Sequence, residues 1–180
     1  SMAITPVTLL LYKRFARART VSLDGVEAAQ NLRCNVLIIG FGRVGQIACQ
    51  APLAQGAKIS IIDINPEVIR AVTPYGFKVY YGDGARHEIL HAAGAHHARA
   101  IIICVDDKNA ATRIVESTRH YCPQVKVVVR AFDREHALEL VKRDADYIVR
   151  ETFEAALLLG RQAVVTLGAS EHEADVVIDF

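Results

Sequence analysis

The sequence contains no tryptophan, a single methionine and no pair of cysteines spaced as C-x-x-C. The missing pair argues against a structural zinc site or a redox motif. No stretch reaches the roughly 18 consecutive apolar residues that a membrane helix needs. The formal net charge is only +1, so charge gives no indication of a nucleic-acid partner. The four cysteines are Cys34, Cys49, Cys104 and Cys122, and we expect them to be reduced, buried thiols rather than disulfides.

The N-terminal 34 residues differ from the rest of the chain. Residues 4–12 are mostly apolar, and a basic cluster follows at once, made of Lys13, Arg14, Arg17 and Arg19. A membrane helix leaves the bilayer on its cytoplasmic side in this way, whereas a signal peptide carries its charges before the apolar segment. Two interpretations stay open: the last turns of a membrane helix, or a short surface helix or disordered leader. We divide the chain into a leader and linker (1–34), a nucleotide-binding domain (35–150) and a final helix with a tail (151–180), and expect it to be part of a longer protein.

From residue 35 onward, apolar runs alternate with helical stretches. The runs predict strands over residues 35–39, 58–62, 78–81, 100–104, 126–129 and 147–149. Several are dominated by β-branched residues, which is typical of strands buried on both faces of a parallel sheet. Helices are predicted over 44–54, 66–73, 85–92, 108–121, 133–143 and 151–167, with Asn65 and Thr152 as candidate caps. The pattern predicts a Rossmann-like α/β fold, a doubly wound parallel sheet of six strands.

The loop between the first predicted strand and the first predicted helix reads Gly40-Phe41-Gly42-Arg43-Val44-Gly45. This is the G-x-G-x-x-G pattern of dinucleotide-binding folds in its expected context. Gly40 permits the tight turn, Gly42 lets the backbone approach a pyrophosphate, and Gly45 lets helix and sheet pack closely. Free N–H groups at the helix start, together with Arg43, then attract the phosphate. The alternative is a glycine-rich turn in a fold that has lost its ligand.

Carboxylates follow three of the predicted strands. Asp63 lies 18 residues after Gly45, where a carboxylate binds the ribose hydroxyls of NAD or AMP and repels the 2′-phosphate of NADP. Ligands of such sheets bind beyond the carboxyl ends of the strands, so the later loops face the same crevice. For Asp83 and Asp106, an Asx-turn or a helix cap is the alternative role. The cofactor-binding candidates beyond the glycine loop are Asp63, Ile64, Gly82, Asp83, Gly84, Ala85 and Asp106.

Together these stretches resemble the RCK (TrkA-N) domains that regulate potassium channels and transporters, in particular the Kef-type potassium–proton antiporters. The resemblance covers about residues 35–167, through NVLIIGFGRVGQI, IIDINPE, KVYYGDGARHEILHAAG, VDD and RETFEAALLLGRQAV. It implies a regulatory, non-catalytic domain at the cytoplasmic face of the bacterial inner membrane, with NAD(H) or AMP as its ligand. It also implies a homodimer, and as partner an antiporter membrane domain in the same chain or in a separate subunit.

Some Kef systems also respond to glutathione, which arginines in the first helix and just before the crossing helix hold. Arg150 matches the second position, but Gln50 occupies the first and cannot supply the charge. The resemblance therefore leaves glutathione control in doubt for this sequence.

The last predicted helix has an apolar face that packs either on its own sheet or, as we favour, against a second copy of the chain. That face consists of Phe153, Ala156, Leu157, Leu159 and Gly160.

Two features of the sequence also fit other chemistries. His87-Glu88-Ile89-Leu90-His91 reads H-E-x-x-H, which on a helix binds catalytic zinc. The segment is only two turns long, and His96 and His97 follow too early to be the third ligand, so we expect at most adventitious metal binding.

A soluble NAD-dependent oxidoreductase is the other alternative, because many such enzymes use this fold. It needs a substrate site, and only one long helix and a short tail follow the last strand. His120 and His136 lie on predicted helices, where a solvated or capping role is usual.

Overall fold

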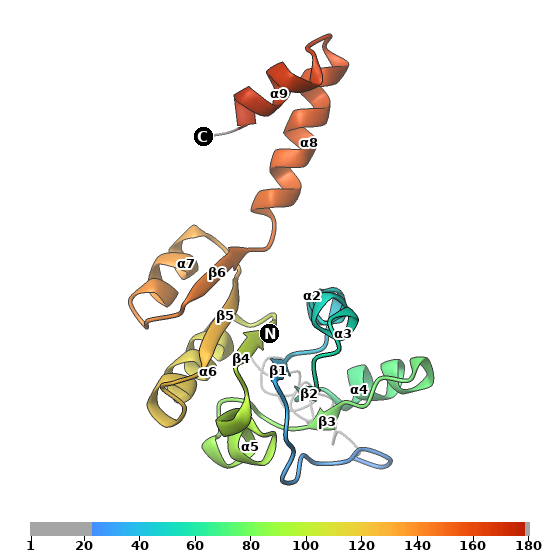
Figure 1. Cartoon of the computed structure of the whole chain (residues 1–180), viewed down its shortest axis with the longest axis vertical. Coiled ribbons are helices and arrows are strands. Elements are labelled where there is room, and N and C mark those ends of the chain that lie inside the picture. Colours follow the sequence, from blue (N-terminus) through green and yellow to red (C-terminus); the bar gives the residue numbers. More distant parts are fainter. Residues whose placement is uncertain (1–22, 179–180) are drawn as a thin grey trace, which may run out of the picture.

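The computed structural model describes residues 23–178 and places six parallel strands in one sheet. The order across the sheet is β3-β2-β1-β4-β5-β6, as Figure 1 shows. This confirms the predicted Rossmann-like fold. The apolar segment at residues 4–12 and the basic cluster after it lie outside the described residues. The strands are β1 (Val36–Ile39), β2 (Ile59–Asp63), β3 (Tyr80–Tyr81), β4 (Ala100–Ile103), β5 (Lys126–Ala131) and β6 (Tyr147–Arg150).

The helices follow the prediction with three differences. The expected helix 44–54 is interrupted at Cys49, because Pro52 has no N–H to donate to the preceding turn. Asn65 caps its helix by accepting from the Glu67 N–H at 2.9 Å, whereas Thr152 makes no capping hydrogen bond because its backbone is already helical. A helix at the C-terminal end was not predicted. The α-helices are α2 (Arg43–Ala48), α3 (Gln50–Ala54), α4 (Pro66–Val72), α5 (His87–Ala92), α6 (Lys108–Tyr121), α7 (Arg134–Val141), α8 (Phe153–Thr166) and α9 (Glu171–Ile178), and 3-10 turns lie at η1 (Thr73–Tyr75) and η2 (Ala95–His97).

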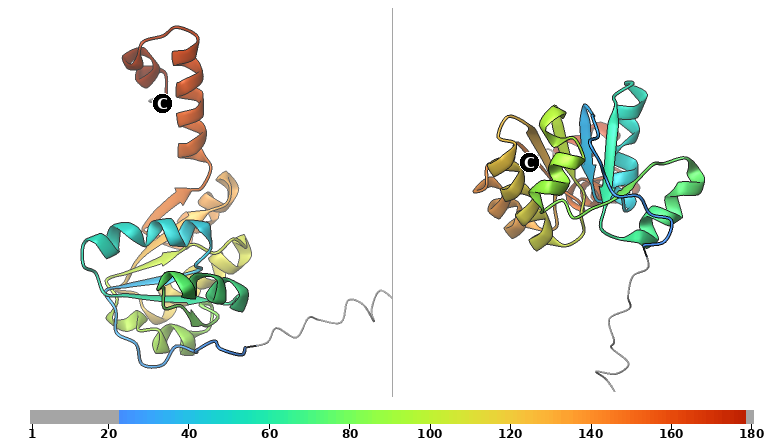
Figure 2. Two further views of the ribbon diagram at one scale, coloured as in Figure 1. Left: turned by 90° about the vertical axis from the view of Figure 1, so that its right-hand side faces the viewer. Right: turned by 90° about the horizontal axis from the view of Figure 1, so that it is seen from below.

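Helices α8 and α9 form a hairpin that projects away from the sheet (Figures 1 and 2). No residue of α8 is buried, so the helix does not pack on its own sheet. Arg161 holds the hairpin together, donating to Asp175 Oδ1 at 2.6 Å and to Glu171. Within residues 23–178, no helix combines the length and apolar character needed to cross a bilayer.

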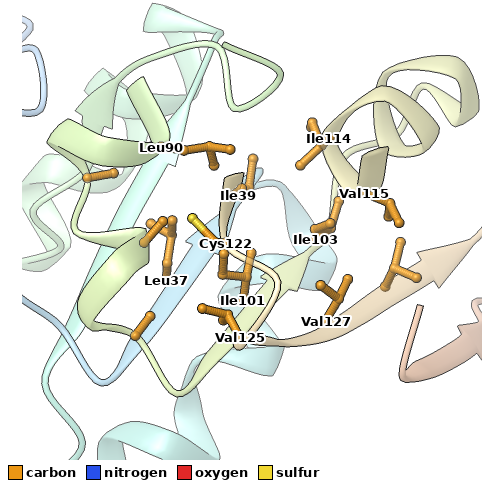
Figure 3. Packing of buried hydrophobic residues seen from close by; sticks show 14 of the residues in the cluster. Leu37, Ile39, Leu90, Ile101, Ile103, Ile114, Val115, Cys122, Val125 and Val127 are labelled. Carbon is orange, nitrogen blue, oxygen red and sulfur yellow. The ribbon is translucent and has the colours of Figure 1, made fainter. Parts of the chain in front are cut away.

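The two faces of the sheet carry separate cores, because successive side chains of a strand point to opposite faces. Helices α2 to α4 cover one face, where Ile38 and Phe41 pack with Ile69. Helices α5 to α7 cover the other, since the chain crosses to the far side of β1 after β3. Figure 3 shows part of this second core, with side chains from β1, β4, β5, α5 and α6 meeting, among them Leu37, Ile39, Leu90, Ile101, Ile103, Ile114, Val115 and Val127.

The segment before β1, which we interpreted as a linker, lies against one edge of the sheet. The Tyr81 N–H donates to the Glu27 carbonyl at 2.7 Å, and Ala28 pairs with Tyr81 as an isolated parallel bridge. Ala29 and Cys34 are buried in the core. The segment before β1 is therefore packed as part of the domain.

Candidate functional site

The glycine loop after β1 has the geometry that its spacing predicts. Gly40 has φ +89°, and a Cβ there would lie 2.8 Å from the Val105 nitrogen. A Cβ at Gly45 would lie 2.2 Å from the Gly40 carbonyl oxygen. At Gly42, in contrast, a Cβ would meet no atom within 4 Å. Sterics thus require glycine at the first and third positions, while the middle one leaves open space for an approaching ligand.

This loop forms one wall of a cavity of about 300 Å³ beyond the carboxyl ends of β1 to β4. The cavity lies where the strand order reverses between β1 and β4, which is the usual ligand site of a doubly wound sheet. We call it the cleft. Eight predicted residues line it: Gly40, Gly42, Asp63, Ile64, Gly82, Asp83, Gly84 and Asp106. The remaining lining residues are Ile39, Asn65, Val68, Cys104, Val105, Asp107, Ala110, Arg113 and Ile114.

Five predicted residues do not line the cleft, and Phe41 differs most from expectation. Its side chain is fully buried and packs edge-on against Phe77, with ring centroids 5.1 Å apart. Only its backbone N–H is directed at a site residue, Asp63. Arg43 is exposed at the first position of α2. The other three are Val44, Gly45 and Ala85, and Gly45 acts through the shape of the loop.

Asp63 is the most firmly held carboxylate of the cleft. Its side chain accepts from the Phe41 N–H at 2.6 Å through Oδ2 and from the Asn65 N–H at 2.7 Å through Oδ1. The residue is only 8% exposed. Each carboxylate oxygen has a second lone pair, so Asp63 can fix the glycine loop and still accept from a ribose hydroxyl.

The other carboxylates have distinct partners. Asp83 forms the Asx-turn that residue type suggested, accepting from the Ala85 N–H at 2.9 Å. Asp107 caps α6 by accepting from the Ala110 N–H at 2.6 Å. Asp106 instead accepts from Arg130 Nη1 at 2.5 Å, and its side chain is 90% exposed. The Asp106 carboxylate is thus openly accessible to a ligand in the cleft.

Arg113 is the lining residue of most interest that the sequence analysis missed. It is the only lysine or arginine among the lining residues, which also include the aspartates Asp63, Asp83, Asp106 and Asp107. The spacing of Ala110, Arg113 and Ile114 on α6 puts these residues on one helical face. Counting helical turns from the Asp107 cap is the signal in the sequence that indicates Arg113 as a residue of the cleft.

Cys104 also lines the cleft. Burial raises the pKa of Cys104 to about 11, so the reactive thiolate is scarce at neutral pH. All four cysteines are free and buried, as we expected.

The H-E-x-x-H segment does not build a metal centre. The His87 ring stacks on Tyr121 with centroids 4.7 Å apart, while His91 meets His96 edge-on at 5.0 Å. Over the described residues 23–178, no three His, Cys, Asp or Glu side chains are grouped so as to hold a metal ion. His120 contacts Tyr121 edge-on.

His136 is buried and accepts from the Phe132 N–H at 3.1 Å through Nδ1. Burial lowers the pKa of this imidazole, which matches a neutral structural histidine.

The candidate second-ligand residue lies at the base of α8. The Arg150 guanidinium carbon is 3.6 Å from the centroid of the Phe153 ring. At the first position of α3, the Gln50 amide donates to the Gln46 carbonyl at 3.2 Å and carries no charge.

The TrkA-N domain family matches residues 36–151, which is most of the described chain. The chain belongs to this family. This TrkA-N chain is 43% identical over 184 residues to a "Glutathione-regulated potassium-efflux system protein" of Haemophilus influenzae. The match covers 99% of the chain and 30% of that relative, so the chain spans less than a third of the relative's length. The resemblance read from the sequence motifs is confirmed.

Two solved structures are similar to this chain, one at the level of the family and one in the fold alone. The Shewanella denitrificans Kef CTD, in its AMP-bound form, is 40% identical with a TM-score of 0.73. That match covers 80% of this chain and 87% of the other. The GsuK channel bound to NAD shares the fold at 19% identity and a TM-score of 0.67, over 87% of this chain and 28% of the other.

Proposed function

We propose that this TrkA-N domain is the nucleotide-binding regulatory domain of a Kef-type potassium efflux system, with AMP or NAD(H) as its ligand. One observation carries the proposal: the open Gly42 position and the Asp63 carboxylate line one cleft at the reversal point of the sheet. AMP is the first ligand to test, because a relative at 40% identity is AMP-bound.

In this proposal the cleft recognises three parts of a nucleotide. The backbone N–H groups at the start of α2 receive the phosphate, since the Phe41 N–H donates to Asp63. Asp63 accepts from the ribose hydroxyls, so a 2′-phosphate is disfavoured there. Asp83 and Asp106 flank the remaining part of the ligand. No residue of the cleft serves as an acid, base or nucleophile, and the domain acts by binding rather than catalysis.

Regulation requires that the ligand prefer one arrangement of the protein over another, since equal affinity for both shifts nothing. We propose that the exposed α8 packs on a second copy of the chain and that nucleotide changes this packing. A membrane domain, in the same longer chain or in a separate subunit, would carry potassium, which places the domain at the cytoplasmic face of the bacterial inner membrane. The relatives' greater length leaves room for such a part.

The test is thermal unfolding with AMP, ATP, NAD, NADH and NADPH, on the native sequence and on Asp63→Ala. A ligand at 100 times its dissociation constant should stabilise the fold by about 2.7 kcal/mol. We expect a shift with AMP or NADH, a weak one with NADPH, and none in the variant.

Asp133→Ala is the matched control, because Asp133 also accepts a backbone N–H but lies at the start of α7, outside the cleft. Its ligand shift should equal that of the native sequence. Glutathione in the same panel should give no shift, because Gln50 lacks the charge of an arginine. Absence of a shift with every nucleotide would end the proposal.

A further inference from the structure

Arg130 lies on β5 between the cleft and the base of the projecting hairpin. Its Nη1 donates to Asp106 Oδ1 at 2.5 Å, and its Nε donates to Glu151 Oε2 at 2.9 Å. Its Nη2 bonds the same Glu151 oxygen. Asp106 lines the cleft after β4, whereas Glu151 follows β6 and comes two residues before α8. One guanidinium therefore bridges the ligand site and the start of α8.

The two halves of this bridge differ in strength. The Arg130 side chain is only 9% exposed, and that of Glu151 is 28% exposed, so their paired bonds are shielded from water. Asp106 is 90% exposed and contributes a single bond. An exposed ion pair contributes little and exchanges readily, whereas a shielded carboxylate oxygen that accepts two charged N–H groups is held more firmly. A ligand can thus displace the Asp106 half without breaking the other.

The base of α8 has few other attachments to the sheet. The Glu151 N–H donates to the Ala131 carbonyl at 3.3 Å, and Arg150 stacks on Phe153 within the hairpin's own base. Because no residue of α8 is buried, its direction depends on residues 150–152. Glu151 is the side chain there that is tied to the body of the domain.

We infer that Arg130 is a positioning residue that transmits occupancy of the cleft to the orientation of α8, an inference that rests on the proposed function. A ligand N–H or O–H group that donates to Asp106 replaces Arg130 Nη1 as its hydrogen-bond donor and releases this nitrogen. The guanidinium then turns fully towards Glu151 and holds the first turn of α8 more tightly. In the empty cleft, Asp106 and Glu151 share the guanidinium, and the base of α8 is looser.

A purely structural role makes a different prediction. If Arg130 only neutralises two carboxylates, lysine should replace it, because lysine keeps the charge. Lysine lacks the planar fork that bonds two carboxylates at once, so it cannot act as the bridge. Arg130→Lys therefore separates bridging from neutralisation while preserving the charge.

The experiment is hydrogen–deuterium exchange of the 180-residue chain with and without AMP, followed over residues 40–48 and 151–157. In the native sequence we expect AMP to slow exchange severalfold in both segments. In Arg130→Lys, the slowing at 40–48 should remain and the slowing at 151–157 should disappear. Arg143→Lys is the control, because Arg143 also bonds two carboxylates, Glu116 and Glu139, away from the cleft.

The outcomes separate the two proposals. No slowing at 40–48 in the native sequence overturns nucleotide binding itself. Slowing at 40–48 but not at 151–157 in the native sequence, or at both segments in Arg130→Lys, overturns the relay and leaves the binding site standing. Should Arg130→Lys fail to fold, Glu151→Gln serves instead, because it weakens the same bond without touching the cleft, and it should abolish the slowing at 151–157 alone.

Discussion

The apolar residues of the sheet and its covering helices are buried, whereas those of the α8–α9 hairpin are largely exposed. In the sheet body, leucine and isoleucine side chains such as Leu140 and Ile103 are fully buried. In the hairpin, Leu158, Leu159 and Leu167 are 63%, 75% and 88% exposed, and Ala174 is the buried residue of α9. The body is stabilised by its own long-range contacts, whereas the hairpin forms from local signals and presents an apolar surface. Such a surface is typical of a protein interaction site.

Alanine at two glycines should give the largest contrast between these regions. At position 45 the new Cβ overlaps the Gly40 carbonyl oxygen, a backbone atom that cannot turn away. We therefore expect the free energy of unfolding to fall by about 3 kcal/mol and nucleotide binding to be lost. At position 160 the Cβ meets nothing within 4 Å, and alanine should stabilise the helix by up to about 1 kcal/mol. Urea unfolding of both variants measures the difference. Equal effects would contradict the contrast.

Truncating one leucine in each region sharpens the comparison. Leu140→Ala empties a site that is 0% exposed and should cost about 2–5 kcal/mol. Leu159→Ala should change the unfolding free energy of the monomer by less than about 0.5 kcal/mol, because its side chain is in solvent. Sedimentation should show weaker self-association for Leu159→Ala. Unchanged association would show that α8 does not lie at a dimer interface.

Charge removal should give a smaller contrast that depends on pH. Partial burial acts to raise the pKa of Asp146, but hydrogen bonds from Lys126, the Val127 N–H and Arg119 outweigh it and hold this pKa below its usual value. Asp146→Asn should cost about 2 kcal/mol at pH 7.

Because the folded pKa of Asp146 is depressed, this contribution is complete above the unfolded value near 3.9 and is lost as pH falls below it. The penalty of Asp146→Asn should accordingly shrink below about pH 4. Asp175→Asn removes the hairpin's counterpart to Arg161, is 56% exposed, and should cost less. Unfolding at pH 7 and pH 3 checks both, and a penalty as large at pH 3 as at pH 7 would contradict the assignment.

The sequence was most informative where chemistry is local. Runs such as residues 100–104 predicted strands, and the glycine spacing located the cleft with Asp63. The bridge through Arg130 could not be predicted, because it joins β4, β5 and β6 and depends on their order and register. Helix α9 could have been predicted, because Ser170 and Glu173 cap each other's N–H groups in an S-x-x-E capping box. Its weak apolar periodicity hid that signal. The interruption before Pro52 was likewise readable from residue type alone.

The strand-like segment at residues 27–28 gives the sheet two unlike edges. It lies along β3, while β6 carries the exposed side chains of Tyr147 and Val149 at the opposite side. A sheet with two open edges behaves like a bifunctional monomer, which adds partners at both ends and grows into fibres. Because the β3 edge is occupied at Tyr81, strand-to-strand pairing at that edge is hindered, and growth by edge pairing is directed to β6 alone.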